Sequence, residues 1–230
     1  MTKKRCFYTI ADNNNLVHYE KLKNSLSKFH PDMELKLFGE DFVKTFNDKA
    51  FYYRATPIIA MKLFNEGYDE ICKLDADQII TGDLSDIWEG DYDAACVYND
   101  PSYEIALWDV KPYYNNGLIV LKNKNFVLHW FRLCYSSHFD KYQFKEQDLM
   151  NLMASDYMTY NIKRLDDGDK IYGESAKPRW TDAVLKDNKI MIGDKELCVI
   201  HFGGGNSPQK GNYRTKFTED VVNKIDELIK

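Results

Sequence analysis

The chain has 230 residues, of which 44% are hydrophobic and 29% are charged. This length and balance predict one compact α/β domain over residues 1–230 and argue against a fibrous, disordered or multidomain protein. The net charge of -5 shows no basic excess, so we expect neither a nucleic-acid partner nor an anionic membrane surface. A nucleotide suits this charge better than a polymer of phosphates.

The cysteines lie far apart, form no CxxC pair and mostly sit in apolar runs. They are Cys6, Cys72, Cys96, Cys134 and Cys198. This distribution predicts reduced core residues in a cytoplasmic protein. The basic start, residues 1–5, leads directly into a strand-like run, and no stretch approaches the length of a membrane span. We therefore expect a cytoplasmic protein without a membrane span.

Apolar residues follow two spacings, which predict strands that alternate with helices. In chain order, the pattern predicts a strand at 6–11, a helix at 19–29, a strand at 34–38, a helix at 56–66, strands at 70–74, 94–98 and 118–121, a helix at 126–134, a strand at 197–202 and a helix at 217–228. The second helix has Pro57 at its first helical position and Gly67 just after its end.

Asp75 and Asp77 follow directly on the predicted strand 70–74. Alternating strands and helices imply a sheet covered on both faces, with its ligand crevice outside the carboxyl ends of the strands. Two residues at i and i+2 near a strand end can project to the same side, so the carboxylates can converge on one hard cation, Mn²⁺ or Mg²⁺. That cation could then bridge a diphosphate.

An isolated Asp-x-Asp is more often a solvated turn than a metal site, so the surrounding sequence decides its meaning. Residues 75–88, Asp-Ala-Asp-Gln-Ile-Ile-Thr-Gly-Asp-Leu-Ser-Asp-Ile-Trp, closely resemble the metal-binding segment of glycosyltransferase family eight, the glycogenin-like and lipopolysaccharide-galactosyltransferase-like enzymes. The resemblance covers most of the chain. It implies a single GT-A domain with a Rossmann-like, mixed and mostly parallel sheet flanked by helices on both faces.

Two further blocks resemble the donor-binding segments of this family. Residues 9–13 look like the first strand and loop that hold the uracil, and residues 114–120 are similar to the strand containing Phe-Asn-(Ser or Ala)-Gly. The resemblance implies that Asn115 lines the donor sugar pocket. The donor-binding residues that it implies in these blocks and around the acidic pair are Thr9, Ala11, Asp12, Leu74, Asp75, Ala76, Asp77, Asn115, Asn116 and Gly117.

Residues 146–151, Glu-Gln-Asp-Leu-Met-Asn, resemble the family block Asp-Gln-x-Leu-Leu-Asn. In the family, the acidic residue and the glutamine lie at the anomeric carbon of the donor sugar. This implies catalytic roles for Glu146, Gln147 and Asp148, with Gln147 also binding the donor. Asp148 matches the third residue of the bacterial version. Glu146 departs from the usual Asp, which keeps the charge but moves the carboxylate.

Residues 199–208 look like the family segment His-Phe-x-Gly-x-x-Lys-Pro-Trp. The resemblance implies that His201 is the third metal ligand, and an imidazole beside two carboxylates suits Mn²⁺. Ser207 replaces the lysine that holds the β-phosphate, and Gln209 replaces the tryptophan. Lys210 could substitute through a shifted loop, while Gly204 would let backbone N–H groups approach phosphate oxygens.

Arg54 and Lys62 are the remaining candidates for anchoring the diphosphate and the donor sugar. Family members carry a comparable basic residue ahead of their Asp-x-Asp strand, and Lys62 fits that position best. The alternative for Lys62 is a solvated lysine on a helix face.

Taken with its residues, the resemblance implies a retaining transfer of a hexose from a UDP-sugar to a hydroxyl acceptor on a carbohydrate, a protein or another molecule. Glucose is the favoured sugar, with galactose and N-acetylglucosamine open. The metal and a lysine would stabilise the charge on the departing UDP without proton transfer. Gln147 would stabilise the positive charge that develops on the sugar.

Several alternatives stay open. Asp75 and Asp77 after a strand also suit haloacid-dehalogenase-like phosphatases, with residues 164–167 as their later acidic pair, although 166–169 resemble a polar turn more closely. A catalytically silent relative could bind a nucleotide sugar. Self-glucosylation on one of the 16 tyrosines and a homodimer are further possibilities. The aromatic residues that could instead stack on an acceptor sugar are Trp108, Tyr113 and Trp180.

Overall fold

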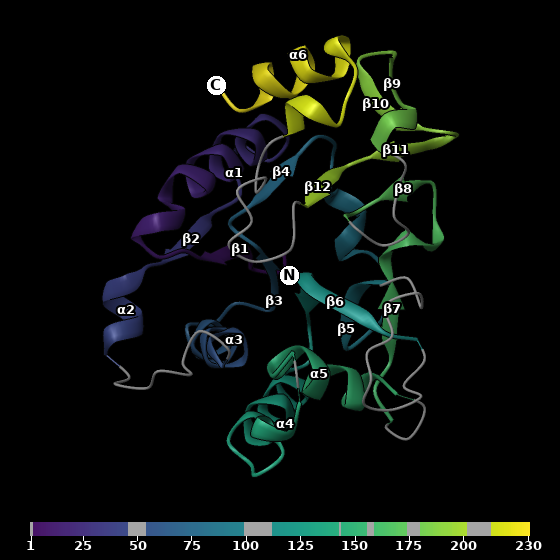
Figure 1. Cartoon of the computed structure of the whole chain (residues 1–230). Coiled ribbons are helices and arrows are strands. Elements are labelled where there is room, and N and C mark those ends of the chain that lie inside the picture. The colour runs from purple at the N-terminus through teal and green to yellow at the C-terminus, as the bar shows by residue number, and fades with distance from the viewer. Residues whose placement is uncertain are drawn as a thin grey trace.

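A six-stranded sheet forms the centre of the protein, with its strands in the order β2-β1-β3-β6-β5-β7 (Figure 1). The structure is a computed structural model that describes residues 2–45, 54–98, 112–142, 144–155, 159–173, 180–201 and 213–230. In sheet order, the strands are Leu35–Phe38, Arg5–Ile10, Glu70–Leu74, Tyr114–Leu121, Ala94–Tyr98 and Ile162–Arg164. Strand β1 is parallel to β2 and β3, and β5 is parallel to β7.

Strand β6 runs antiparallel to both of its neighbours, β3 and β5. The sheet is therefore mixed and mostly parallel, as predicted. The parallel strands β1, β2 and β3 end at the same edge, so the residues that follow β1 and β3 meet there. This edge carries the residues of the candidate site.

Helices cover both faces of the sheet, which confirms the predicted α/β architecture (Figure 1). Alternate residues of β1 show the division, because Tyr8 packs with α3, α4 and α5, whereas Phe7 packs with α1 on the other face. The helices are α1 Leu16–Phe29, α2 Glu40–Lys44, α3 Ala55–Asn65, α4 Lys124–Cys134, α5 Glu146–Ala154 and α6 Glu219–Leu228.

A second group of strands extends the molecule beyond the central sheet. The four-stranded sheet has the order β8-β11-β10-β9, formed by Lys170–Ile171, Lys195–Leu197, Lys189–Ile192 and Ala183–Lys186. Strand β12, Val199–His201, pairs antiparallel with β4, Gln78–Ile80. Helix α6 packs beside β9, and its buried residues Val221 and Ile225 join the core of this part.

The structure changes some predicted boundaries. Helix α3 begins at Ala55, so Pro57 occupies its third position, and Gly67 beyond its end has a φ of 84°, which favours glycine. The predicted strand 197–202 is divided at Cys198, which lies between β11 and β12. The N–H of Cys198 donates to the carbonyl of Ile171 in β8, and its carbonyl accepts the N–H of Thr81. The strand predicted at 118–121 begins earlier, at Tyr114. Its first half includes Asn115 and Asn116, so the apolar pattern alone did not mark it as strand.

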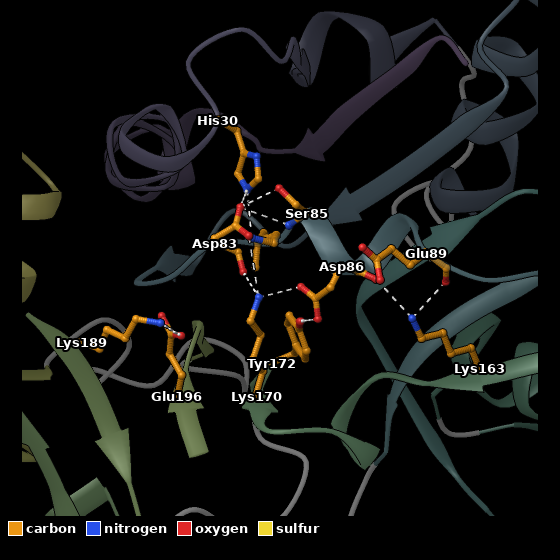
Figure 2. Close-up of polar contacts among 11 residues, drawn as sticks. His30, Asp83, Ser85, Asp86, Glu89, Lys163, Lys170, Tyr172, Lys189 and Glu196 are labelled. Carbon is orange, nitrogen blue, oxygen red and sulfur yellow. Dashed lines mark hydrogen bonds and ion pairs between the residues drawn. The ribbon is translucent and has the colours of Figure 1, made fainter. Parts of the chain in front are cut away.

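Polar and charged side chains connect residues 83–86, which follow β4, to the end of α1 and to β8 (Figure 2). Lys170 donates to the carbonyl of Asp83 at 2.7 Å and to Oδ1 of Asp86 at 2.8 Å. The hydroxyl of Tyr172 donates to Oδ2 of Asp86, and Nε2 of His30 accepts the backbone N–H of Leu84 at 3.0 Å. Each carboxylate oxygen of Asp86 is thus paired, so this network has a structural role.

All five cysteines are buried free thiols, as the sequence predicts. In the described ranges, no helix has both the length and the apolar character needed to cross a membrane.

Candidate metal and donor site

Asp75, Asp77 and His201 converge at the carboxyl edge of the central sheet. Asp75 follows the last residue of β3 and Asp77 precedes β4, so both lie in the turn that joins these strands. Because β12 pairs with β4 and places His201 opposite Gln78, it brings the imidazole from far along the chain. The Nε2 atom of His201 lies 3.4 Å from Oδ2 of Asp75 and 3.5 Å from Oδ1 of Asp77.

This cluster fits a divalent cation. One ligand atom from each of the three side chains lies within 4.8 Å of the others. Two carboxylate oxygens and one imidazole nitrogen form a donor set that suits Mn²⁺ and leaves coordination positions for other oxygen ligands. The side chain of Asp75 is about one third exposed, so the cluster is open to solvent on one side.

The cluster strongly perturbs its own titrating groups. Burial opposes ionisation of Asp75, but Lys73 and His201 outweigh it and hold the pKa of Asp75 well below its usual range. Burial also disfavours the charged form of His201, yet the hydrogen bonds that Asp75 and Asp77 accept from the imidazole outweigh it and raise the pKa of His201 to about 10. A cation that binds through this imidazole therefore has to displace a proton.

Gly117 in β6 allows the backbone to pass directly beneath this cluster. The carbonyl of Gly117 accepts the N–H of Asp75 at 2.8 Å. A Cβ atom at this position would collide with the His201 ring and would lie 2.9 Å from Oδ2 of Asp75 and 2.7 Å from Oδ1 of Asn115. A side chain at position 117 would therefore displace the candidate metal ligands.

Lys73 is a site residue that the sequence analysis missed. It lies in β3 on the same face as Asp75 and is 5% exposed. Its Nζ atom lies 2.7 Å from Oδ1 of Asp75 and donates to the carbonyl of Asn116 at 2.9 Å. A lysine between buried Cys72 and Leu74 was the available signal, because charged groups are rarely fully buried unless paired.

Gln147 lies at the start of α5, where its amide joins two neighbouring groups. Its Oε1 atom accepts the backbone N–H of Asn116 at 3.1 Å, and its Nε2 atom donates to the hydroxyl of Tyr113 at 3.0 Å. Lys73 contacts the carbonyl of the same Asn116. A chain of polar contacts therefore connects the cluster to Gln147.

Asp148 has both carboxylate oxygens engaged. Tyr113 donates to Oδ1 at 2.7 Å, and the backbone N–H of Phe144 donates to Oδ2 at 2.8 Å. The side chain is buried, and these contacts position Tyr113 and the turn before α5. Both oxygens of Asp148 thus hold neighbouring groups in place, and the catalytic role that the resemblance implies stays a prediction.

Glu146 lies near Lys73 and Asp75, and the pKa of its carboxyl group is raised. Burial raises its pKa to about 8, even though the charge of Lys73 opposes this shift. Its carbonyl accepts the indole N–H of Trp130 at 2.8 Å, which fixes the start of α5 against α4. The preceding residue, Lys145, has a φ of 49°, and such strained backbone is common at functional sites.

The residues predicted to hold the uracil lie at the same edge. Thr9 is the second-last residue of β1 and follows Tyr8, which pairs with Lys73. Ala11 comes directly after the strand and is buried. Asp12 accepts the N–H of Asn15 at 3.0 Å and so caps the turn that leads into α1.

Three buried polar side chains near this edge have unsatisfied atoms within the described part of the chain. They are the hydroxyl of Thr9, the amide of Gln78, which follows Asp77, and the side-chain nitrogen of Asn116. Buried polar atoms are usually hydrogen-bonded, so these side chains favour a polar ligand at this edge. Gln78 was not among the predicted site residues.

The structure does not bring Lys62 to the cluster. Lys62 pairs with Glu66 at 2.6 Å, and the carbonyl of Glu66 accepts a hydrogen bond from Lys4, which precedes β1. Lys62 therefore lies toward the opposite, amino edge of the parallel strands. Arg54 donates to the carbonyl of Cys134 at 2.9 Å, so it packs against the end of α4.

Other predicted residues have structural contacts or fall outside the description. Trp180 packs edge-on against Phe217, with ring centroids 5.4 Å apart. Asp166, assigned to a polar turn, is buried and accepts the backbone N–H groups of Tyr98 and Tyr172. The residues that lie outside the described ranges are Trp108, Gly204, Ser207, Gln209 and Lys210.

Solved structures of low sequence identity share this fold. The bifunctional glycosyltransferase WbbM matches with a TM-score of 0.60 at 15% identity, over 94% of this chain and 52% of that protein. The galactosyltransferase LgtC, solved with donor and acceptor sugar analogs, gives 0.62 at 15% identity, over 97% and 94% of the two chains. GlyE from Streptococcus pneumoniae TIGR4 gives 0.58 at 15% identity, over 98% and 63%.

No protein-family model matches the chain, and no curated protein matches it in sequence. The chain spans about half the length of WbbM but nearly all of LgtC. At such identities, the likeness establishes the architecture alone. The chain therefore has the mixed α/β fold of the GT-A glycosyltransferases.

Proposed function

We propose that the protein is a metal-dependent, retaining glycosyltransferase that moves a hexose from a UDP-sugar to a hydroxyl acceptor. The observation that carries this proposal is the cluster of Asp75, Asp77 and His201 at the carboxyl edge of a GT-A sheet. In an open α/β sheet this edge is where ligands bind. Glucose is the favoured sugar, and galactose and N-acetylglucosamine remain candidates.

Each group at this edge has a role in the proposed reaction. Asp75, Asp77 and His201 would hold the cation, which supplies charge stabilisation for the diphosphate that leaves the sugar. Gln147, held by Asn116 and Tyr113, would place its amide beside the developing sugar cation. The acceptor hydroxyl would attack on the face that UDP leaves, and a phosphate oxygen would take its proton.

The free, buried state of the cysteines favours a reducing compartment. All five are free and buried, and burial raises the pKa of Cys6 to about 12, so its thiol stays protonated and unreactive. We therefore propose a cytoplasmic location.

A screen of UDP release tests the proposed function. Purified protein is incubated with UDP-glucose, UDP-galactose or UDP-N-acetylglucosamine, in the presence of Mn²⁺, Mg²⁺ or a chelator. We expect release that requires the cation and is lost in Asp77→Asn. The matched control is Asp167→Asn, because Asp167 is an exposed carboxylate paired with Arg164.

The alternatives give different outcomes in the same screen. Release that persists with chelator would remove the metal mechanism. Binding of UDP-sugar with Mn²⁺ but no release over hours, with or without acceptors, would indicate a catalytically silent relative. Metal-dependent hydrolysis of p-nitrophenyl phosphate without UDP release would indicate a phosphatase.

A further inference from the structure

Lys73 places a buried positive charge directly beside the candidate metal ligands. Its ammonium lies 2.7 Å from Oδ1 of Asp75, while Oδ2 of the same carboxylate faces His201 at 3.4 Å. The two oxygens of Asp75 thus have different partners. Lys73 occupies one of them, so the cation is left with Oδ2.

A second contact keeps Lys73 in this place. Nζ donates to the carbonyl of Asn116 at 2.9 Å, and the side chain is only 6% exposed. If Lys73 moved away when a cation arrived, it would lose both contacts and leave its charge buried without a partner, which is strongly unfavourable. The ammonium therefore stays beside the cluster when the cation binds.

The charges of the cluster follow from these contacts. With a neutral imidazole, as metal ligation requires, Asp75 and Asp77 supply two negative charges and Lys73 cancels one of them. The nearby Glu146 is buried, which favours its neutral form. A divalent cation in this cluster would leave one positive charge uncompensated, and the diphosphate of a nucleotide could compensate it.

We infer that Lys73 makes cation binding at this cluster depend on the nucleotide, so that Mn²⁺ binds weakly alone and tightly together with a nucleoside diphosphate. The inference rests on the proposed function, in which the cluster holds both a cation and a UDP-sugar. Linkage is reciprocal, so Mn²⁺ increases the affinity for UDP by the same factor. The cluster would thereby stay largely empty until the donor arrives.

The test measures Mn²⁺ binding with and without UDP. Free Mn²⁺ is followed by its electron paramagnetic resonance signal, with a correction for the Mn²⁺–UDP complex measured without protein. In wild type, we expect UDP to tighten Mn²⁺ binding by about tenfold or more. In K73M, we expect Mn²⁺ alone to bind about tenfold or more tightly than in wild type, because a like charge is removed at close range. The tightening by UDP should fall by a similar factor.

Matched variants separate charge from packing. K73Q is neutral but keeps an amide that can donate to Asn116, so it carries the test if K73M does not fold. K73R keeps the charge, and we expect it to retain weak binding of Mn²⁺ alone. K122M removes another buried lysine, which donates to the carbonyls of Trp88 and Gly90 away from the cluster, and we expect wild-type Mn²⁺ binding.

The results distinguish failure of this inference from failure of the proposed function. Wild-type protein that binds no Mn²⁺, with or without UDP, would contradict the metal-dependent function. Wild-type protein that binds Mn²⁺ equally well with and without UDP would overturn only the role of Lys73. A folded K73M or K73Q protein whose affinity for Mn²⁺ alone is unchanged or weaker would also overturn the role of Lys73. A K73R protein that binds Mn²⁺ alone as tightly as K73M would overturn it too.

Discussion

The Oε1 atom of Gln147 accepts the backbone N–H of Asn116 at 3.1 Å, so the first turn of α5 is held to the strand that passes beneath the candidate metal ligands. The carbonyl of the same Asn116 accepts the ammonium of Lys73. A single peptide segment of β6 therefore holds groups from β3 and α5 in a fixed relation.

Gln147→Leu should abolish most activity while leaving nucleotide binding in place. The substitution removes the amide proposed to act on the sugar, and we expect UDP release to slow by about 100-fold. It also leaves the Asn116 N–H without its partner, which should lower the free energy of unfolding by about 1–2 kcal/mol. Steady-state kinetics and urea denaturation measure the two effects.

Tyr113→Phe is the companion variant, because it removes only the hydroxyl that lies between Gln147 and Asp148. We expect a smaller loss of activity, about tenfold or less, since Gln147 keeps its contact with Asn116. If Gln147→Leu were as active as wild type, the proposed role of the glutamine would be wrong.

Gly117→Ala should damage the metal cluster through a steric effect. The added methyl group would collide with the His201 ring and lie 2.9 Å from Oδ2 of Asp75. We expect Mn²⁺ affinity in the presence of UDP to fall by at least about tenfold, and stability to fall by about 1–3 kcal/mol. Calorimetric titration and thermal denaturation measure these changes.

The matched control is Gly168→Ala, because a Cβ at Gly168 would meet no atom within 4 Å. This variant should retain wild-type Mn²⁺ affinity. A Gly117→Ala protein that binds Mn²⁺ as wild type does would show that the cluster tolerates displacement of its ligands.

His30 contributes stability that should be lost in mild acid. Burial lowers the pKa of His30, Lys170 adds to this, and the charge of Asp83 opposes it only in part. The folded state therefore takes up the proton at lower pH than the unfolded chain. The stabilisation is fully present above the unfolded pKa of about 6.5, and it is lost as pH falls through that value toward the folded pKa.

The measurement compares His30→Gln with wild type by urea denaturation at about pH 7.5 and about pH 5.5. Glutamine can accept the N–H of Leu84 but does not titrate, so the acid-dependent loss contributed by His30 should be absent from the variant. His138→Gln, at an exposed position, is the control and should keep the wild-type pH dependence. Equal pH dependence in His30→Gln and wild type would contradict the assignment.

Lys62→Ala should leave UDP affinity unchanged within about twofold, because the side chain pairs with Glu66 at the amino edge of the sheet. The loss of this exposed pair should change stability by less than about 1 kcal/mol. Fluorescence titration of UDP in the presence of Mn²⁺ gives the affinity. A large loss of UDP binding would restore the role first predicted for Lys62.

The sequence by itself determined the kind of fold and the acidic part of the site. Local spacing of apolar residues predicted β1, α1, β3 and α4 closely, because one buried face imposes its period directly on the chain. The position of Asp75 and Asp77 after a buried strand followed from the same pattern. Residues that are adjacent in sequence need no tertiary information to be placed together.

Only the tertiary structure decided which distant groups meet at that edge. The pairing of β12 with β4 places His201 beside the two aspartates, and the antiparallel β6 places Asn116 within reach of Lys73. Lys62 and Lys73 both precede the acidic pair in the sequence. Helix α3 nevertheless places Lys62 toward the amino edge of the sheet, whereas β3 places Lys73 beside Asp75. Strand pairing and the direction of each element set these distances, and neither can be read from local spacing.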